Sequence, residues 1–447
     1  MTTQTAEPAY WSTTQKIVFR FFMLFFLLYI FFNPNRVLPY PDNLLAIYIK
    51  PFHKVVPWIG AHILHLNKPI IIAITGSGDT TYDYIIILLI FSMSIIGTVV
   101  WSITGRNTSN YNKLLYWLIV VIRYYVAIIM ICYGYYKVIK LQFPAPSFSK
   151  LLEPVGKLSP MGLAWTYMGH SRAFNYFTGF AEITTGLLLF CRKTSTLGAI
   201  AGFVIAANIM AIDYCFDVPL KLLATTLVIM CLFLMLRDKS RLINFFFRNK
   251  EALPSNLTPY RFKARWKNAT LIVIKYVLII YTIYFGLADA LAREKQYGGK
   301  AKKPPLYGIY NVEAFIKNSD TLKPLTTDTI RWRRFMISRD GSAQIQMMDD
   351  SIRHYSFKPD IKKRSVIAHT DADTTHKFNF IYNLTKPGLA ELKNFKGVNK
   401  TDTATYLIIK GMWKKDSVEV WMRRLDPTGF LLLQRGFHWV NESAYNK

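Results

Sequence analysis

Two charged residues lie within apolar stretches of this sequence that are long enough to cross a membrane. Glu182 is at the midpoint of the run 173–190, and Arg123 lies inside the run 114–136. A charge at bilayer depth costs roughly 2.5 to 3.5 kcal/mol on insertion scales, and such residues usually find a partner inside a bundle. At about 1.5 Å per residue, each is about 13 to 14 Å from its helix end. We therefore predict an ion pair between Arg123 and Glu182.

The chemistry open to this pair is proton movement or quinone binding, and the alternative is a structural pair that fixes helix register. A second polar group is predicted at the external ends of the same spans, beside Asp79. It could form a substrate or headgroup pocket, although span ends ordinarily carry polar residues. This outer-mouth cluster comprises Tyr133, Lys137, His170, Asn208, Asp213, Asp217 and Lys221.

The elements that must position these residues are membrane spans. The 447 residues are 52% hydrophobic and 15% aromatic, which is typical of a polytopic membrane protein. A span of about 20 residues crosses about 30 Å of hydrocarbon. We predict seven spans, at residues 17–32, 84–101, 114–136, 173–190, 196–212, 219–236 and 269–287.

The distribution of Lys and Arg predicts the orientation of these spans. The loop 237–267 holds nine basic residues against only Asp238 and Glu251, which places it in the cytoplasm. The amino terminus is then cytoplasmic, and everything after residue 287 is external. The net charge of +28 is explained by membrane-flanking loops that attract anionic lipids. A nucleic-acid partner is not expected, because the basic residues form no stripe interleaved with stacking aromatics.

The sequence changes character from about residue 300, where charged residues become common and the hydrophobic period drops to two. Strands are predicted there, and consecutive strands without helices favour an antiparallel sandwich or small barrel after the linker 299–305. In the segment 417–424, alternation puts Val418, Val420 and Met422 on one face. The predicted strands are 331–337, 343–348, 377–382, 405–410, 417–424 and 430–434.

Residues that could hold a cofactor are scarce. Four cysteines form no CxxC pair, and no haem or iron–sulfur ligand set and no metal site are evident. The external domain shows no nucleophile with a base and no phosphate-cradling loop. No cofactor is evident in the sequence, and a quinone is the one candidate if the function is redox. A non-enzymatic function is favoured over an enzymatic one.

The region 133–236 resembles the DoxX-like membrane proteins. The matching residues are Tyr133, Gly134 and Lys137, then Gly179, Glu182 and Gly186, then Arg192 and Thr196 to Gly198. The resemblance implies a bacterial inner-membrane protein with a four-helix core at 114–236 and an appended β-rich periplasmic domain at 299–447. The remaining parts are an amino-terminal membrane region at 1–113, and a basic loop with the seventh span at 237–298.

Three functions are open at this point. The first is an assembly or accessory protein, whose external domain docks a protein partner in the cell envelope. The second is a quinone-linked redox subunit that uses Arg123 and Glu182. The third is a carrier of lipid or small molecules that uses the outer-mouth cluster, with membrane lipids as partners in every case.

Overall fold

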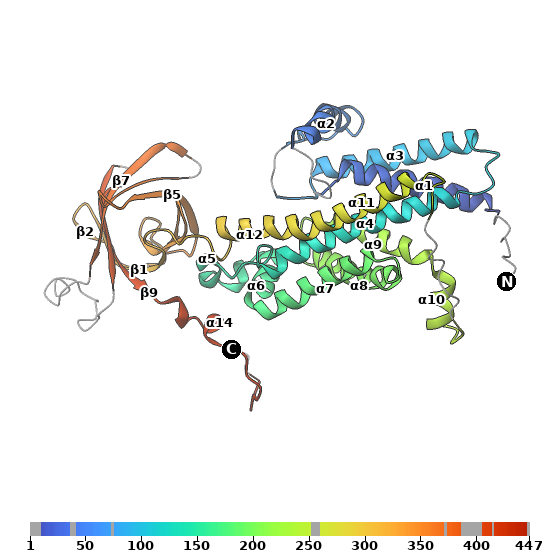
Figure 1. The fold of residues 1–447 in the computed structure, drawn as a ribbon. Coiled ribbons are helices and arrows are strands. Elements are labelled where there is room, and N and C mark those ends of the chain that lie inside the picture. Colours follow the sequence, from blue (N-terminus) through green and yellow to red (C-terminus); the bar gives the residue numbers. More distant parts are fainter. Residues whose placement is uncertain are drawn as a thin grey trace. The chain divides into compact units, whose positions relative to one another are not determined.

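The chain forms two compact units, a helical unit and a barrel unit (Figure 1). The helical unit comprises residues 1–142 and 172–293, and the barrel unit comprises residues 143–171 and 294–447. The chain therefore passes between the units three times. The computed structural model describes residues 10–35, 42–72, 76–251, 260–370, 373–385, 405–413 and 415–444.

The helical unit is built from apolar helices whose starts carry sequence signals. Ser12 and Gln15 form a capping box at the start of α1, and Thr80 and Asp83 form one at the start of α3. The helices are α1 (Thr13–Phe32), α2 (Asp42–His62), α3 (Thr81–Thr104), α4 (Asn112–Val138), α7 (Arg172–Phe190), α8 (Ser195–Cys215), α9 (Lys221–Leu236), α10 (Lys239–Phe246), α11 (Arg265–Ile280), the π-helical turn Tyr281–Phe285 and α12 (Gly286–Gln296).

Five helices in the described part of the chain are long and apolar enough to cross a membrane. They are α1, α3, α4, α8 and the continuous helix Arg265–Gln296, and α9 is apolar but shorter. The predicted span 173–190 corresponds to α7, which is not among the five and carries Arg172, Asn175 and Glu182. The structure thus contains several helices suited to crossing a membrane, with α7 more polar than the rest.

The helix α4 is the centre of the helical unit. It packs along α7 and also contacts α1 and α9, and most of its apolar stretch is buried. The continuous helix Arg265–Gln296 is the opposite case, because only 6% of its most apolar stretch is buried. An apolar helix that is exposed on nearly all sides is suited to a lipid environment. The charged side chains of α4 and α7 at Arg123, Lys137 and Glu182 are buried within the helical unit.

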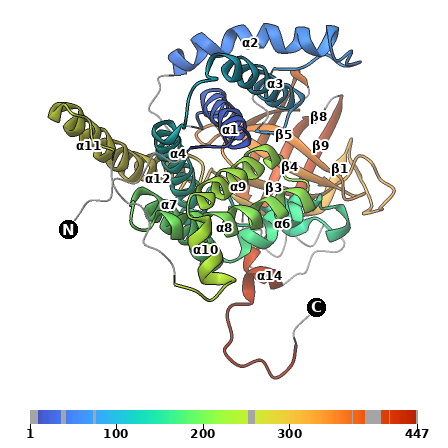
Figure 2. The same ribbon diagram turned by 90° about the vertical axis from the view of Figure 1, so that its right-hand side faces the viewer.

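The carboxy-terminal part folds into a closed antiparallel barrel of eight strands, in the order β1-β3-β4-β5-β6-β7-β8-β9, with β1 also paired to β9. The short β2 extends β1 as a hairpin, and the labelled strands can be followed in Figure 2. This confirms the small-barrel alternative to the sandwich. The strands are β1 (Gly308–Lys317), β2 (Asp320–Thr321), β3 (Trp332–Arg339), β4 (Ser342–Met347), β5 (Ile352–Asp360), β6 (Ser365–Thr370), β7 (Asp373–Thr385), β8 (Tyr406–Trp413) and β9 (Asp416–Leu425).

Side chains fill the interior of the barrel. Phe315, Trp332 and Phe335 are buried in one core, and Trp413 packs against it, stacked on Phe378 with ring centroids 4.5 Å apart. An eight-stranded barrel has an interior just wide enough for its own side chains. As far as the described strands show, the barrel lumen is therefore a packed core.

The predicted alternation in β9 is confirmed, because Val418, Val420 and Met422 are all buried. The predicted strand 430–434 is wrong. Leu431–Gln434 forms the short helix α14 after a turn in which Asp426 accepts from the Thr428 N–H. The apolar run there has no neighbouring strand in the described structure, so its β propensity is not expressed.

The segment 143–171 belongs to the barrel unit, although the sequence suggested a simple external loop of the helical core. It contains α5 (Phe148–Leu152), the 3-10 turn Val155–Lys157 and α6 (Pro160–His170). Phe148 is buried in a cluster with Ile309 of β1 and Met336 of β3. The insertion is therefore an integral part of the barrel unit.

Candidate functional sites

A buried ion pair joins the two most closely packed helices of the helical unit. The Lys137 ammonium on α4 donates to Glu182 Oε1 on α7, and the side chains are 7% and 1% exposed. The second oxygen, Glu182 Oε2, accepts no hydrogen bond within the described structure. A pair of this kind compensates the burial of both charges, and breaking it leaves an unpaired buried charge.

The predicted ion pair between Arg123 and Glu182 is therefore wrong. The guanidinium of Arg123 donates to the carbonyl of Phe190, with N to O 3.4 Å, and lies over the Tyr124 ring. Phe190 is eight residues after Glu182, which is about 12 Å along a helix. Arg123 thus lies about two turns away from the level of Glu182.

Two close glycine contacts explain how far α4 and α7 are shifted along one another. A Cβ on Gly134 would lie 2.7 Å from the Gly179 carbonyl oxygen, and a Cβ on Gly186 would lie 2.6 Å from the Ala127 carbonyl oxygen. Such approaches require glycine. They fix α4 against α7 so that Lys137, one turn beyond Gly134, reaches Glu182. The depth estimate failed because it assumed that both spans begin and end at the same level.

Asp213 adds a second buried carboxylate close to this pair. Its residue is 4% exposed, and Oδ2 has no hydrogen-bond partner within the described structure. The Asp213 carboxylate is close enough to interact electrostatically with Lys137, Lys221 and Asp79. The Tyr133 phenol interacts in the same way with Glu182 and Asp213. The structure therefore brings together these members of the outer-mouth cluster with Glu182, which the sequence analysis had assigned to a different pair. We call this set the charge cluster: Tyr133, Lys137, Glu182, Asp213 and Asp79.

Asp79 links the charge cluster to the start of α9. Its two carboxylate oxygens accept from the backbone N–H groups of Lys221 and Leu222, at 2.7 and 3.0 Å. The Lys221 ammonium pairs with Asp217 at 2.8 Å, and the Asp217 side chain is 85% exposed. The bond from Asp79 satisfies otherwise unpaired helix N–H groups, whereas the exposed pair contributes little.

Replacing Asp79 with alanine is expected to destabilise the start of α9 by about 1 kcal/mol, because a capping acceptor is lost. Hydrogen exchange of the α9 amides in the purified protein measures this as faster exchange at Lys221 and Leu222. The control is Asp217→Asn, which removes the exposed pair but tolerates the positive φ of 51°. Equal exchange in the two variants would contradict the assigned cap.

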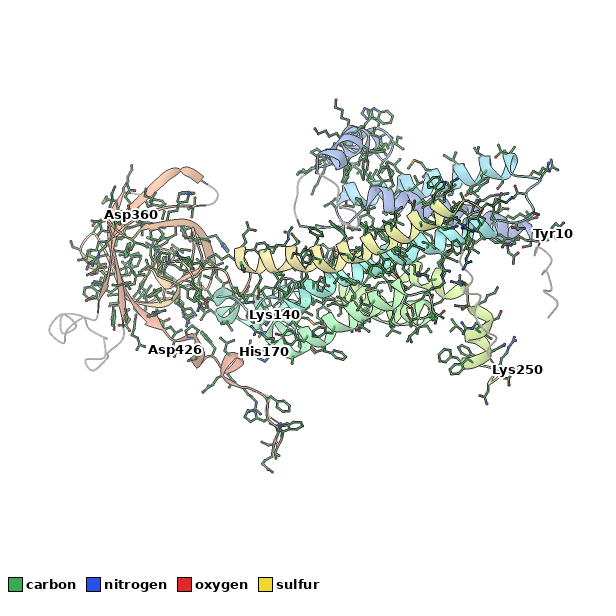
Figure 3. All side chains as sticks on the ribbon, viewed as in Figure 1. Tyr10, Lys140, His170, Lys250, Asp360 and Asp426 are labelled. Carbon is green, nitrogen blue, oxygen red and sulfur yellow. The ribbon has the colours of Figure 1, made fainter. Side chains whose placement is uncertain are left out.

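Two members of the predicted outer-mouth cluster, Asn208 and His170, are exposed side chains that are not part of the charge cluster. Asn208 is exposed on α8, five residues before the buried Asp213 and therefore on a different face of the helix. His170 is exposed at the end of α6 and belongs to the barrel unit (Figure 3). The prediction grouped all polar span ends together, but only side chains on the inward faces of the helices meet.

The barrel unit carries a groove of about 680 Å³ that the sequence analysis missed. Its apolar wall includes Phe148 and Leu151 of α5, and the rings of Phe148 and Tyr307 are 5.0 Å apart. The other walls come from the linker before β1, the ends of β1, β7 and β9, and α14. Because these segments are far apart in the sequence, only the fold assembles them. The Pro-rich, basic stretch 299–305 was the one local signal.

The two charged residues that line this groove, Lys303 and Arg424, are both basic. The Lys303 ammonium lies 4.9 Å from the centre of the Tyr307 ring, and Arg424 donates to the Tyr307 carbonyl at 3.2 Å. Burial raises the pKa of Tyr310, with Arg424 acting against it, so the phenol keeps its proton and donates to the Leu306 carbonyl at 2.9 Å. The groove thus combines apolar walls with an accessible cation, Lys303.

Comparison with known proteins gives one limited similarity. The chain is 39% identical over 84 residues to an uncharacterized protein of Bacillus subtilis (strain 168), YwoB. The match covers 19% of this chain, and the chain spans about half the length, 54%, of that relative. No family model matches the chain, and no solved structure matches it significantly.

Proposed function

We propose that this chain is a DoxX-like accessory protein of a bacterial inner membrane, whose helical unit anchors a barrel unit that docks a protein partner. The observation that carries this proposal is the groove of the barrel unit. Its apolar walls and basic rim have the character of a recognition surface. The lumen of the barrel is filled by its own side chains, so the groove lies outside the packed core.

The residues that resemble the DoxX-like proteins support the first part of the proposal. Gly134 and Gly179 form the close contact of α4 with α7, and Lys137 and Glu182 form the ion pair beside it. These four residues, which carry the resemblance, thus share one structural role, the packing of α4 against α7. In this proposal the pair is structural, and it fixes the register that holds the bundle together.

The orientation belongs to the same proposal. The segment 143–171 and the barrel form one compact unit, so both are on the same side of the membrane. The basic loop that contains α10 is on the opposite side if α11 and α12 cross the bilayer. The positive-inside rule then makes that loop cytoplasmic and the barrel unit periplasmic.

The groove favours a peptide segment with apolar side chains and at least one carboxylate. Phe148 and Leu151 provide an apolar wall for such side chains, and Lys303 is exposed at the rim. An acidic group beside Lys303 would gain charge complementarity, which selects partners more than it adds affinity. A cationic partner would be repelled at the same position.

Site-specific photocrosslinking in membranes of cells that express the full chain tests the docking function. A photoreactive residue at Leu151 is expected to give a discrete protein adduct. The same residue at Ile381, an exposed apolar position on β7, is the control. The variant Lys303→Glu is expected to reduce the adduct several-fold, whereas Lys363→Glu, in the exposed turn after β5, is expected to leave it unchanged.

The outcomes of this experiment are distinct. Sequencing of the crosslinked peptide is expected to identify an apolar segment that contains Asp or Glu. No adduct at Leu151, an equal adduct at Ile381, or an adduct that ignores the charge of residue 303 would each overturn the docking proposal.

A second candidate function, a quinone-linked redox subunit, is favoured by the two buried carboxylate oxygens. Glu182 Oε2 and Asp213 Oδ2 are buried and accept no hydrogen bond within the described structure. A buried acceptor of this kind could receive a proton or the hydroxyl of a reduced quinone. Organic extraction of the purified full chain is expected to yield a quinone under this hypothesis. The hypothesis would be refuted if the extract contained no quinone and if the extract of Glu182→Gln did not differ from it.

A further inference from the structure

The segment that follows the barrel, Phe430–Val440, exposes an unusual concentration of apolar side chains. Phe437, Trp439 and Val440 are 78%, 91% and 72% exposed, and the three leucines of α14 are each more than 40% exposed. Single exposed apolar residues are ordinary, but a contiguous set on one segment marks an interaction surface. In Figure 3 this segment leads away from the barrel strands beyond the labelled Asp426.

The polar groups of the same segment bond locally. Arg435 donates to the Asn441 side chain at 2.7 Å, and a ring nitrogen of His438 is 2.9 Å from the Gly436 carbonyl. These short-range bonds shape the backbone around the aromatic side chains without covering them. An amphipathic aromatic ring such as that of tryptophan is favoured at the boundary between water and lipid.

The segment starts at the end of the barrel that is connected to the helical unit. Leu425, the last residue of β9, is paired with Ile309 at the start of β1. The linker before β1 comes directly from the continuous helix Arg265–Gln296, which is long enough to cross a membrane. A short connection to a spanning helix keeps this end of the barrel within reach of the bilayer surface.

The charge at this end of the barrel fits an anionic surface. Lys302, Lys303 and Arg424 are exposed there, and Arg435 lies within the segment itself. The exposed acidic residues nearby in the sequence are Asp426 and Glu442. The balance is positive. Each Lys or Arg close to an anionic leaflet adds electrostatic attraction to the membrane surface.

We propose that Phe430–Val440 is an interfacial membrane anchor, which inserts Phe437 and Trp439 at the boundary of headgroups and acyl chains of an anionic phospholipid bilayer. It holds the connected end of the barrel on the membrane surface. The inference goes beyond the proposed docking function: it concerns Phe437 and Trp439, which do not line the groove, although α14 at the start of the segment does. Aromatic anchoring combined with basic residues is the usual composition of interfacial segments.

Fluorescence quenching in proteoliposomes tests the anchor in the full chain. The exposed cysteines Cys191 and Cys215 are first replaced by serine. An environment-sensitive dye is then attached at Trp439→Cys, or at Ile381→Cys as an exposed control on the barrel wall. In vesicles of phosphatidylcholine and phosphatidylglycerol, lipids with a spin label near the headgroup are expected to quench the dye at 439 several-fold more than at 381.

The alternatives give different results. Equal quenching by aqueous iodide at both positions, with no quenching by spin-labelled lipid, would overturn the proposal. If the segment binds a second copy of this chain, protection of the dye would depend on protein density in the vesicles, and lipid quenching would be lost. Arg435→Glu is expected to reduce lipid quenching in the anionic vesicles but not in vesicles of phosphatidylcholine alone.

Discussion

Replacing Lys137 with methionine is expected to lower the free energy of unfolding by about 3 to 5 kcal/mol, because the buried carboxylate of Glu182 loses its partner. Methionine keeps a similar volume, so the loss reports the charge and not a cavity. The measurement is the unfolding of the purified full chain in mixed micelles, followed by circular dichroism as a denaturing detergent is added.

The double variant Lys137→Met/Glu182→Met separates the ion pair from other effects. Apolar replacement of both partners is often neutral or stabilising, so most of the lost stability is expected to return. A double variant as unstable as Lys137→Met alone would show that Lys137 acts through other contacts.

Arg123→Met provides a control within the same helix. The Arg123 side chain makes one long hydrogen bond to a carbonyl and a ring contact, and its Nε has no partner in the described structure. We expect this variant to change the free energy of unfolding by no more than about 1 kcal/mol. A larger loss in Arg123→Met than in Lys137→Met would restore Arg123 as the main partner in the bundle.

The contrast between Arg123 and Lys137 shows which information a sequence lacks. Apolar runs are local, and the run 114–136 predicted α4 to within two residues at each end. The partner of Glu182 depends on how far α4 and α7 slide past one another. That stagger is fixed by backbone contacts between glycines on different helices, and a hydrophobicity pattern contains no such distance.

In the barrel, too, local patterns were predicted correctly and contacts between distant segments were not. The alternation of apolar and polar residues identified the buried face of β9, because successive side chains of a strand point to opposite faces. The closure of the barrel by Ile309 and Leu425, and the groove formed beside it, depend on pairing between distant segments. Arg331 is a further case: it is buried, and its guanidinium donates to the Leu322 and Val312 carbonyls, which the local sequence does not indicate.

Replacing Gly134 with alanine is expected to destabilise the helical unit by about 1 to 3 kcal/mol, despite the higher helix propensity of alanine. The added Cβ would lie 2.7 Å from the Gly179 carbonyl oxygen and 3.1 Å from the Ile183 backbone nitrogen. Backbone atoms cannot rotate away, so α4 and α7 must separate. The same titration in mixed micelles measures the loss.

Gly286→Ala is the matched control, because a Cβ there would lie no closer than 3.4 Å to the Tyr135 ring. This variant is expected to be neutral or stabilised by up to about 1 kcal/mol. Separation of α4 from α7 would also weaken the ion pair one turn away. The effects of Gly134→Ala and Lys137→Met should therefore be less than additive when combined, whereas strict additivity would mean that the glycine contact and the ion pair are independent.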